Sequence, residues 1–317
     1  MANPKVGFTF SQIQCEYLGL DVKETFNAVC DLHPNIIRLC CYWNEIEPHH
    51  NQWNFETIDW LLKQCEEKNI DVVLSLGMKS PRWPEFHFPE WVTNLCNTQQ
   101  TEQSLDCDEI LRQYCLRFIS QVVEHTKGFK CINYYQVENE GLGRVGIAGN
   151  RFLSEEFLKD ETELVTSLKR DDQKIVLTCA IDLWPPLSTE DTKLFEKSAE
   201  LADAVGINVY TKVPANNSYL TPTHFYWQKL KKWQKHLEKL GKESWISELQ
   251  AEPWEDGGHV HTSQMDYPSA SPEETKNIFE KIKEMGYQTI LLWGVEYWYW
   301  QKLHGEDKWW NEMNSIF

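Results

Sequence analysis

The chain has 317 residues, of which 41% are hydrophobic and 25% charged, the composition of an ordinary globular protein. Its formal net charge is -17 at pH 7, and so much negative charge repels nucleic acid phosphates and anionic lipid surfaces. We therefore expect neither a nucleic acid nor a membrane partner, and no apolar run reaches the ~18 residues that a membrane span requires.

Short apolar segments rich in Val, Ile and aromatic residues indicate eight buried strands. In chain order they cover residues 5–10, 35–41, 70–76, 131–137, 174–180, 203–210, 243–249 and 287–294. Longer helical patterns alternate with them at 21–32, 55–68, 106–126, 154–170, 189–201, 223–240, 272–285 and 306–316. Ser154 and Ser271 each precede acidic residues, a typical helix start.

Eight strands, each followed by a helix, predict an α/β fold of the (β/α)8 TIM barrel type. The alternative is an open doubly wound sheet, which the strand count alone does not exclude. Because no Gly/Ser linker, internal repeat or low-complexity tract interrupts the pattern, we expect a single domain over residues 1–317.

Three connections that follow strands are unusually long: 77–105, 141–153 and 250–271. In a barrel all three would rise from the C-terminal face, where active sites are built. Two of the preceding strands end in carboxylates. One ends in Asn139-Glu140, and the other in Ser247-Glu248. Cleavage of a glycosidic bond needs two carboxylates that flank the bond, so this pair predicts glycoside chemistry.

These residues carry a resemblance to a known superfamily. Asn139-Glu140 after the fourth strand and Glu248 after the seventh resemble the catalytic positions of clan A of the glycoside hydrolases, the retaining β-glycosidases. The stretches 37–55 and 81–84 are similar to the clan's second strand and to an aromatic, proline-rich loop in some members. The resemblance spans nearly the whole chain and implies a TIM barrel.

The resemblance also implies roles. Glu140 would be the acid/base and Glu248 the nucleophile. Asn139 would bind the sugar 2-hydroxyl, and Arg38 and Tyr210 would hold Glu248 ionised and oriented. Trp293 would form the platform under the sugar, and the remaining substrate-binding candidates are Trp83 and Glu296. The third strand ends in Gly77-Met78-Lys79, where many members have a histidine, so this chain departs from the clan at that position.

Several alternatives stay open at this point. Glu138 competes with Glu140 for the acid role, since strand alternation would place both side chains on the same side. Lys79 and Arg82 either meet an anionic group of the substrate or pair with a loop glutamate. The chain could also be a barrel that binds carbohydrate without cleaving it, or a transglycosylase that uses the same residues.

Two further motifs would indicate other functions, dinucleotide binding and metal binding. Residues 141–146 fit G-x-G-x-x-G, but a dinucleotide site needs the glycines to lead directly into a helix, and further loop residues intervene here. His259 and His261 have the spacing of a metal pair without an evident third ligand. We therefore expect no cofactor and no metal, and an oligosaccharide or glycoside as the substrate.

The ten cysteines form no C-x-x-C pair, and several lie within predicted helices or strands. This usage favours a reducing compartment. No signal peptide is visible in the segment MANPKVGFTF. We expect a cytoplasmic protein, and secretion after removal of a leader is the alternative.

Overall fold

The computed structural model describes residues 3–144, 146–183, 189–256, 262 and 264–317. Eight parallel strands succeed one another around a closed barrel in the order β1-β10-β9-β6-β5-β4-β3-β2. This confirms the predicted (β/α)8 architecture over the open sheet. The barrel strands are β1 (Lys5–Thr9), β2 (Ile36–Cys40), β3 (Asp71–Leu76), β4 (Ile132–Val137), β5 (Lys174–Ala180), β6 (Ala204–Val209), β9 (Glu243–Gln250) and β10 (Thr289–Trp293).

Each predicted helix is present to within a few residues. The eight are α2 (Val22–Cys30), α4 (Glu56–Lys68), α6 (Glu109–Thr126), α7 (Glu155–Leu168), α8 (Thr189–Leu201), α9 (His224–Leu240), α10 (Pro272–Met285) and α12 (Lys308–Asn314). Both expected helix starts are caps. The Ser154 hydroxyl accepts from the N–H of Phe157, and the Ser271 hydroxyl accepts from the N–H of Glu274.

The sequence pattern missed short or unpatterned elements. They are α1 (Gln12–Tyr17), α3 (Trp43–Ile46), α5 (Glu90–Leu95), α11 (Val295–Leu303) and a hairpin of β7 (Val213–Ala215) and β8 (Ser218–Leu220). The first three are too short for a helical period to stand out. In α11 most residues are buried, so no polar stripe marks it as a helix. Within the described residues no helix has the length and apolar character to cross a membrane.

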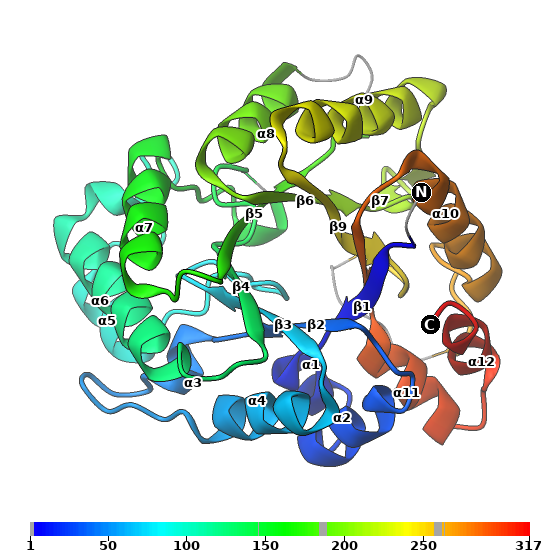
Figure 1. The fold of residues 1–317 in the computed structure, drawn as a ribbon, viewed down its shortest axis with the longest axis horizontal. Helices are drawn as coiled ribbons and strands as arrows, with labels where there is room; N and C mark the ends of the chain where they lie inside the picture. Colours follow the sequence, from blue (N-terminus) through cyan, green and yellow to red (C-terminus); the bar gives the residue numbers. More distant parts are fainter. Residues whose placement is uncertain (1–2, 145, 184–188, 257–261, 263) are drawn as a thin grey trace. The chain divides into compact units, whose positions relative to one another are not determined.

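The described residues form two compact units, each discontinuous along the chain. The first unit comprises 1–38, 180–191 and 206–317, and the second comprises 39–179 and 192–205. In the first unit β1 lies between β10 and β2 (Figure 1), and Thr9 pairs with both Trp293 and Arg38. A Cβ on Gly7 would lie 1.7 Å from the carbonyl oxygen of Ile36, so this close strand approach requires glycine.

The second unit is built on the pairing of β3 with β4 and of β4 with β5. Helices α6 and α7 lie side by side on its outer side (Figure 1). Fully buried apolar side chains from the strands and from α6, among them Val73, Tyr135 and Phe118, form its core. Burial on both faces explains why β3 and β4 lack the alternation of a half-exposed strand.

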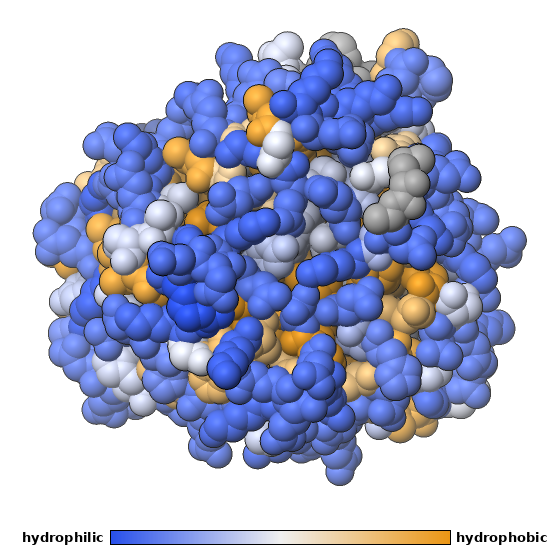
Figure 2. Space-filling view, viewed as in Figure 1, coloured by the Kyte–Doolittle hydropathy of each residue, from blue (hydrophilic) through white to orange (hydrophobic). Residues whose placement is uncertain are grey.

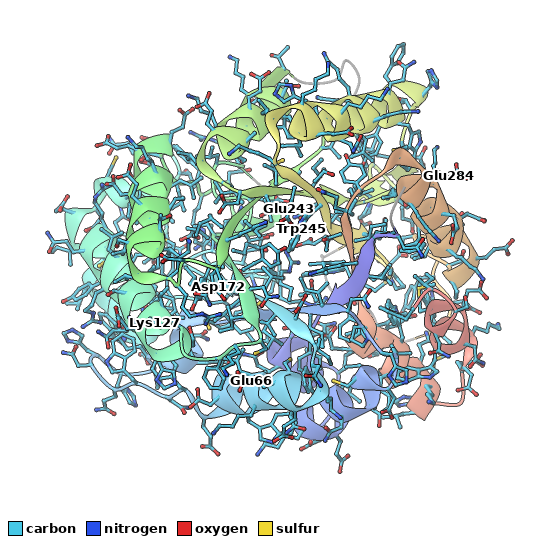
Figure 3. All side chains as sticks on the ribbon, in the orientation of Figure 1. Glu66, Lys127, Asp172, Glu243, Trp245 and Glu284 are labelled. Carbon is cyan, nitrogen blue, oxygen red and sulfur yellow. The ribbon has the colours of Figure 1, made fainter. Side chains whose placement is uncertain are left out.

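Side chains on the face seen in Figure 2 are mostly hydrophilic, as the charged fraction and the net charge of -17 lead one to expect. Figure 3 labels Glu243 and Trp245, which lie at the start of β9. There the Trp245 indole donates to the Glu243 carboxylate at 3.0 Å. Glu248 lies near the other end of the same strand, the C-terminal end, where barrel enzymes place their chemistry.

Candidate active site

Glu248 lies on β9 in the first unit, with only 4% of its surface exposed. Each carboxylate oxygen accepts one hydrogen bond. The Arg38 guanidinium reaches Oε1 at 2.7 Å, and the Tyr210 hydroxyl reaches Oε2 at 2.7 Å. Two donors of fixed position hold the carboxylate in one orientation, and the guanidinium balances its charge.

Arg38 is itself completely buried on β2. Its Nε donates to the hydroxyl of Thr9 at 2.9 Å, and its guanidinium lies 5.7 Å from the ring centre of Trp293. A buried guanidinium is tolerated only when its charge is paired and its N–H groups are bonded. Three other barrel strands thus contribute one side chain each to the group around Glu248: Thr9 from β1, Arg38 from β2 and Trp293 from β10.

Tyr210 follows the last residue of β6 and packs edge-on against Trp254, with ring centres 4.9 Å apart. The loop after Tyr210 is fixed from β9. Gln250 is buried, and its Oε1 accepts from the N–H groups of Thr211 at 2.8 Å and Lys212 at 2.9 Å. Because Gln250 follows Glu248 by two residues, one strand end orients both the carboxylate and the loop that bears its tyrosine partner.

Two further candidates lie at the end of β10. Trp293 is its last residue and is 8% exposed. Glu296 lies in the first turn of α11, where it is fully buried and its Oε1 accepts the N–H of Ser11 at 2.5 Å. The substrate-binding roles of these two residues stay predictions.

In the second unit, Asn139 and Glu140 lie in the turn after β4, separated from its last residue by Glu138. They are 2% and 8% exposed. One hydroxyl fixes both residues, because Thr178 accepts the N–H of Glu140 at 2.9 Å and donates to Asn139 Oδ1 at 3.4 Å. Thr178 lies on β5, so the strand next to β4 holds the turn that carries Glu140.

The structure separates the two glutamates of the E-N-E motif. β4 ends at Val137, and Glu138 and Glu140 both have a left-handed backbone, with φ of 57° and 48°. Strand alternation therefore does not apply to them, and the two side chains have different surroundings. Glu138 is fully buried, and its carboxylate accepts the N–H groups of Met78 at 2.8 Å and Lys79 at 2.6 Å. A carboxylate bound to two backbone amides supports the turn, which leaves Glu140 as the acid/base candidate.

Lys79 is fully buried and pairs with Glu85, with 3.2 Å between Nζ and the carboxylate. Its Nζ also donates to the carbonyl oxygen of Glu140 at 3.1 Å. Of the two partners considered for Lys79, a substrate anion and a loop glutamate, the structure shows the glutamate, Glu85. Trp83, in contrast, is 44% exposed in the loop after β3, next to a cis bond to Pro84. An indole ring can stack on a sugar, and this role of Trp83 stays a prediction.

The structure bears on one of the two remaining motifs, the glycine motif at 141–146. After Gly141 the chain continues through a short 3-10 helix, Gly146–Ala148, and α7 begins only at Glu155, so the glycines do not lead into a long helix as a dinucleotide fold requires. His259 and His261 lie outside the described residues.

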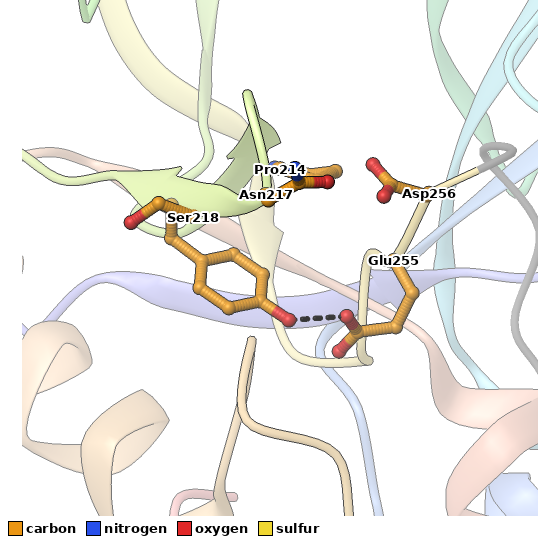
Figure 4. A pocket seen from close by; sticks show the side chains of 6 residues that line it. Pro214, Asn217, Ser218, Glu255 and Asp256 are labelled. Carbon is orange, nitrogen blue, oxygen red and sulfur yellow. Dashed lines mark hydrogen bonds between the residues drawn. The ribbon is translucent and has the colours of Figure 1, made fainter.

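A polar hollow of about 170 Å³ lies in the first unit beside the β7–β8 hairpin (Figure 4). In it the Tyr219 hydroxyl donates to the Glu255 carboxylate, and this hydrogen bond raises the pKa of Tyr219 to about 12. Glu255 also accepts from the Ser269 hydroxyl at 2.6 Å. None of the predicted site residues lines this hollow.

Comparison with known proteins supports the resemblance to clan A. Residues 21–157 match the profile of a glycoside hydrolase family described as Beta-galactosidase. The match covers less than half of the chain. It includes Glu140 and ends before Glu248. No curated protein sequence matches this chain.

Solved glycosidases share the fold. A β-galactosidase from the haloarchaeon Halorubrum lacusprofundi is 12% identical with a TM-score of 0.62, and the match covers 91% of this chain and 52% of that one. Xylanase 10B from Thermotoga maritima is 16% identical with a TM-score of 0.59, over 92% and 83%. A GH5_18 protein from Streptomyces cattleya in complex with GlcNAc is 12% identical with a TM-score of 0.63, over 92% and 70%. This chain thus spans about half of the β-galactosidase, and identities this low establish the fold alone.

The sequence reasoning missed residues that act through others. Thr178 fixes Asn139 and Glu140, Gln250 fixes the Tyr210 loop, and Thr9 fixes Arg38. Each is a buried polar residue at or near the C-terminal end of a barrel strand. That position is the one signal in the sequence that would have found them, because a polar side chain at such an end faces the site rather than the core.

Proposed function

We propose that the protein is a retaining β-glycosidase in which Glu248 is the nucleophile and Glu140 the acid/base. The observation that carries the proposal is the pairing of Glu248, at the end of the seventh barrel strand, with one donor on each oxygen, Arg38 and Tyr210. A nucleophilic carboxylate must be ionised, oriented and aimed at one face of the sugar, and these two donors supply the orientation and the balancing charge.

In the first step Glu248 attacks the anomeric carbon from the α face while Glu140 protonates the departing glycosidic oxygen. In the second, Glu140 removes a proton from water, which attacks the same carbon from the β face and releases Glu248. Asn139 would donate its amide to the sugar 2-hydroxyl, Trp293 and Trp83 would stack on sugar rings, and Glu296 would bind a hydroxyl.

The comparisons support a substrate class for this proposal. The matched profile is that of β-galactosidases, and the structures of similar fold include a β-galactosidase and a xylanase. We therefore propose β-linked glycosides as substrates, with β-galactosides tested first. A set of 4-nitrophenyl β-glycosides of galactose, glucose, xylose and N-acetylglucosamine samples this class.

The test separates the two glutamates. Glu248→Ala and Glu140→Ala are assayed with a 2,4-dinitrophenyl β-glycoside, with and without azide. Azide in the space left by Glu248 attacks from the α face and gives the α-glycosyl azide. In the Glu140 variant, azide attacks the glycosyl-enzyme from the opposite face and gives the β-azide. Glu163→Gln, an exposed change on α7, is the control that keeps full turnover.

If Glu248→Ala cleaves the substrate at the wild-type rate, the assignment of Glu248 as the nucleophile is contradicted. Proton NMR of the first product gives a second check, since a retaining enzyme releases the β-anomer. Release of the α-anomer would indicate inversion, for which the carboxyl groups stand about 6.5–9.5 Å apart rather than about 5–5.5 Å. Sugar binding without turnover in the wild type would instead identify a non-catalytic barrel.

A further inference from the structure

Three buried side chains that the proposed mechanism does not use lie together in the second unit. They are Cys115 on α6, Glu138 after β4 and Glu161 on α7. The sulfur and one carboxyl oxygen of each glutamate lie within 4.8 Å of one another, and Glu138 and Glu161 are completely buried. Two ionised carboxylates this close, out of contact with water, repel each other strongly, so the pair must contain a compensating positive charge or a proton.

The hydrogen bonds indicate which glutamate is ionised. Both oxygens of Glu138 accept backbone N–H groups, at 2.8 Å and 2.6 Å, an arrangement that suits a carboxylate. Glu161 Oε1 accepts from the Cys115 thiol at 3.3 Å. Its Oε2 is buried, and no donor reaches it from the described part of the chain. As a carboxylate oxygen it would lack a partner, whereas as a hydroxyl it can donate to Glu138.

We propose that Glu161 is a protonated acid hydrogen-bonded to the Glu138 carboxylate, and that this pair positions the turn that carries Glu140. The proposal rests on the proposed function, because it assigns a purpose to the position of Glu140. Glu138 and Glu161 are positioning residues, since neither contacts the sugar.

The pair acts through Lys79. Glu138 binds the N–H of Lys79, and the carbonyl oxygen of Lys79 accepts the N–H of Asn139 at 2.7 Å. The Lys79 ammonium donates to the carbonyl oxygens of Glu140 at 3.1 Å and Gly143 at 3.5 Å. Lys79 is thus bonded to each end of the Asn139–Glu140 segment, and the Glu138 carboxylate fixes the backbone from which Lys79 extends.

The electrostatics agree with one shared proton. Burial raises the pKa of Glu138 to about 7. Burial, then the charge of Glu138, raises the pKa of Glu161 well above its ordinary value, and Asp106 adds to this. Lys79 acts in the opposite direction on Glu138. Burial also raises the pKa of the Cys115 thiol, which therefore remains a donor.

A thiol and two carboxyl groups are also ligands that a zinc ion accepts. Each Glu138 oxygen accepts one backbone N–H and keeps a second lone pair, which can accept the hydroxyl of a protonated Glu161. A proton also neutralises the pair without an ion having to enter the interior. Metal content is therefore one of the measurements below.

The kinetic test compares Glu161→Ala with Glu161→Gln on the 4-nitrophenyl β-glycoside that the wild type cleaves fastest. Removal of the acid should lower kcat by about 10-fold or more with KM changed by less than about twofold, since a buried hydrogen bond to a charge is lost. The glutamine amide donates as a protonated acid does, so Gln should restore most of kcat. A Gln variant as slow as the Ala variant overturns the proposal. Glu163→Gln is the control on the same helix.

Glu138→Gln is the second variant if Glu161→Ala does not fold. Its NH2 group would face a backbone N–H in place of an acceptor oxygen, and the same loss of kcat is expected. An unchanged kcat in this variant contradicts the positioning role.

Infrared spectroscopy tests the proton without any substrate. At neutral pH the wild type should show the carbonyl stretch of a buried carboxylic acid, and Glu161→Gln should lack it while Glu163→Gln keeps it. Absence of the band in the wild type, or one equivalent of metal per chain that Glu161→Gln loses, overturns the proposal. If no glycoside is cleaved, the proposed function fails, and the infrared result still decides the pair.

Discussion

At the residue scale, Glu248 depends on two hydrogen bonds of equal length from residues far apart in the chain. Arg38 is buried and comes from β2, whereas Tyr210 is partly exposed and follows β6. Neither donor is close to Glu248 in sequence. Their roles differ accordingly, since the guanidinium supplies charge and the phenol supplies orientation from the accessible side.

Tyr210→Phe removes one of these bonds and leaves the ring packing against Trp254 intact. A hydrogen bond to a charged group contributes about 1.5–3 kcal/mol, so kcat should fall by roughly 10- to 100-fold. The measurement is the steady-state rate on the preferred β-glycoside. Tyr219→Phe is the matched control, because Tyr219 also donates to a glutamate, Glu255, and should leave kcat within about twofold. Equal rates for Tyr210→Phe and wild type would contradict the assigned role.

At the scale of elements, the end of β3 packs closely against the turn after β4, and Gly77 lies at the contact. This residue has φ of +118°, and a Cβ there would lie 2.2 Å from Oε1 of Glu138. The sequence shows a glycine after a strand, but only the packed structure shows that the space is taken by a carboxylate.

Gly77→Ala should therefore destabilise the protein by about 2–4 kcal/mol, through backbone strain and displacement of Glu138. Urea denaturation measures the change in the free energy of unfolding. Gly128→Ala is the control, because among the described residues, apart from its chain neighbours, none has a heavy atom within 4 Å of a Cβ built there. A loss below about 1 kcal/mol at Gly77 would show that the turn adapts without strain.

The start of α10 tests a feature that the sequence predicts directly. Ser271 caps the helix, with its hydroxyl accepting the N–H of Glu274 at 3.3 Å. Ser271→Ala should cost about 1 kcal/mol of stability and leave kcat unchanged, because only the helix end loses its acceptor. The exposed Ser218, in the hairpin, is the comparison site, where substitution by alanine should cost less than about 0.5 kcal/mol. Equal losses at the two positions would contradict the capping role.

At the scale of the whole molecule, buried ionisable groups set opposing trends of stability with pH. Burial lowers the pKa of His87 to about 4, so the neutral ring contributes stability above its ordinary value of 6.5 that is lost as the pH falls toward 4. The Glu138–Glu161 pair has the opposite effect, and its contribution to stability falls as the pH rises. Its raised pKa values mean that the folded state keeps a proton that the unfolded chain releases.

The difference in the free energy of unfolding between Glu161→Gln and wild type isolates the effect of the Glu138–Glu161 pair, because both proteins contain His87. Well below pH 4.5, the ordinary pKa of a glutamate, folded and unfolded wild type both hold the proton. As the pH rises toward 7, only the folded wild type does, and its free energy of unfolding should fall relative to the variant by about 1.4 kcal/mol per pH unit. Urea denaturation at pH 5, 6, 7 and 8 measures this. A difference that does not change with pH would mean that Glu161 titrates normally.

The sequence by itself determined the order of strands and helices, the caps at Ser154 and Ser271, and the strand ends that carry Asn139, Glu140 and Glu248. These features arise from local propensity and hydrophobic period, which neighbouring residues encode. The resemblance to clan A added the expected roles.

Only the tertiary structure decided what each polar group contacts. Glu138 and Glu140 look equivalent in the E-N-E motif, and it is the left-handed backbone after Val137 that sends them to different surroundings. Lys79 could have met a substrate anion, and it is the fold of its loop that brings Glu85 to it. Hydrogen bonds between residues distant in sequence depend on distances of tenths of an ångström, and no local pattern specifies those distances.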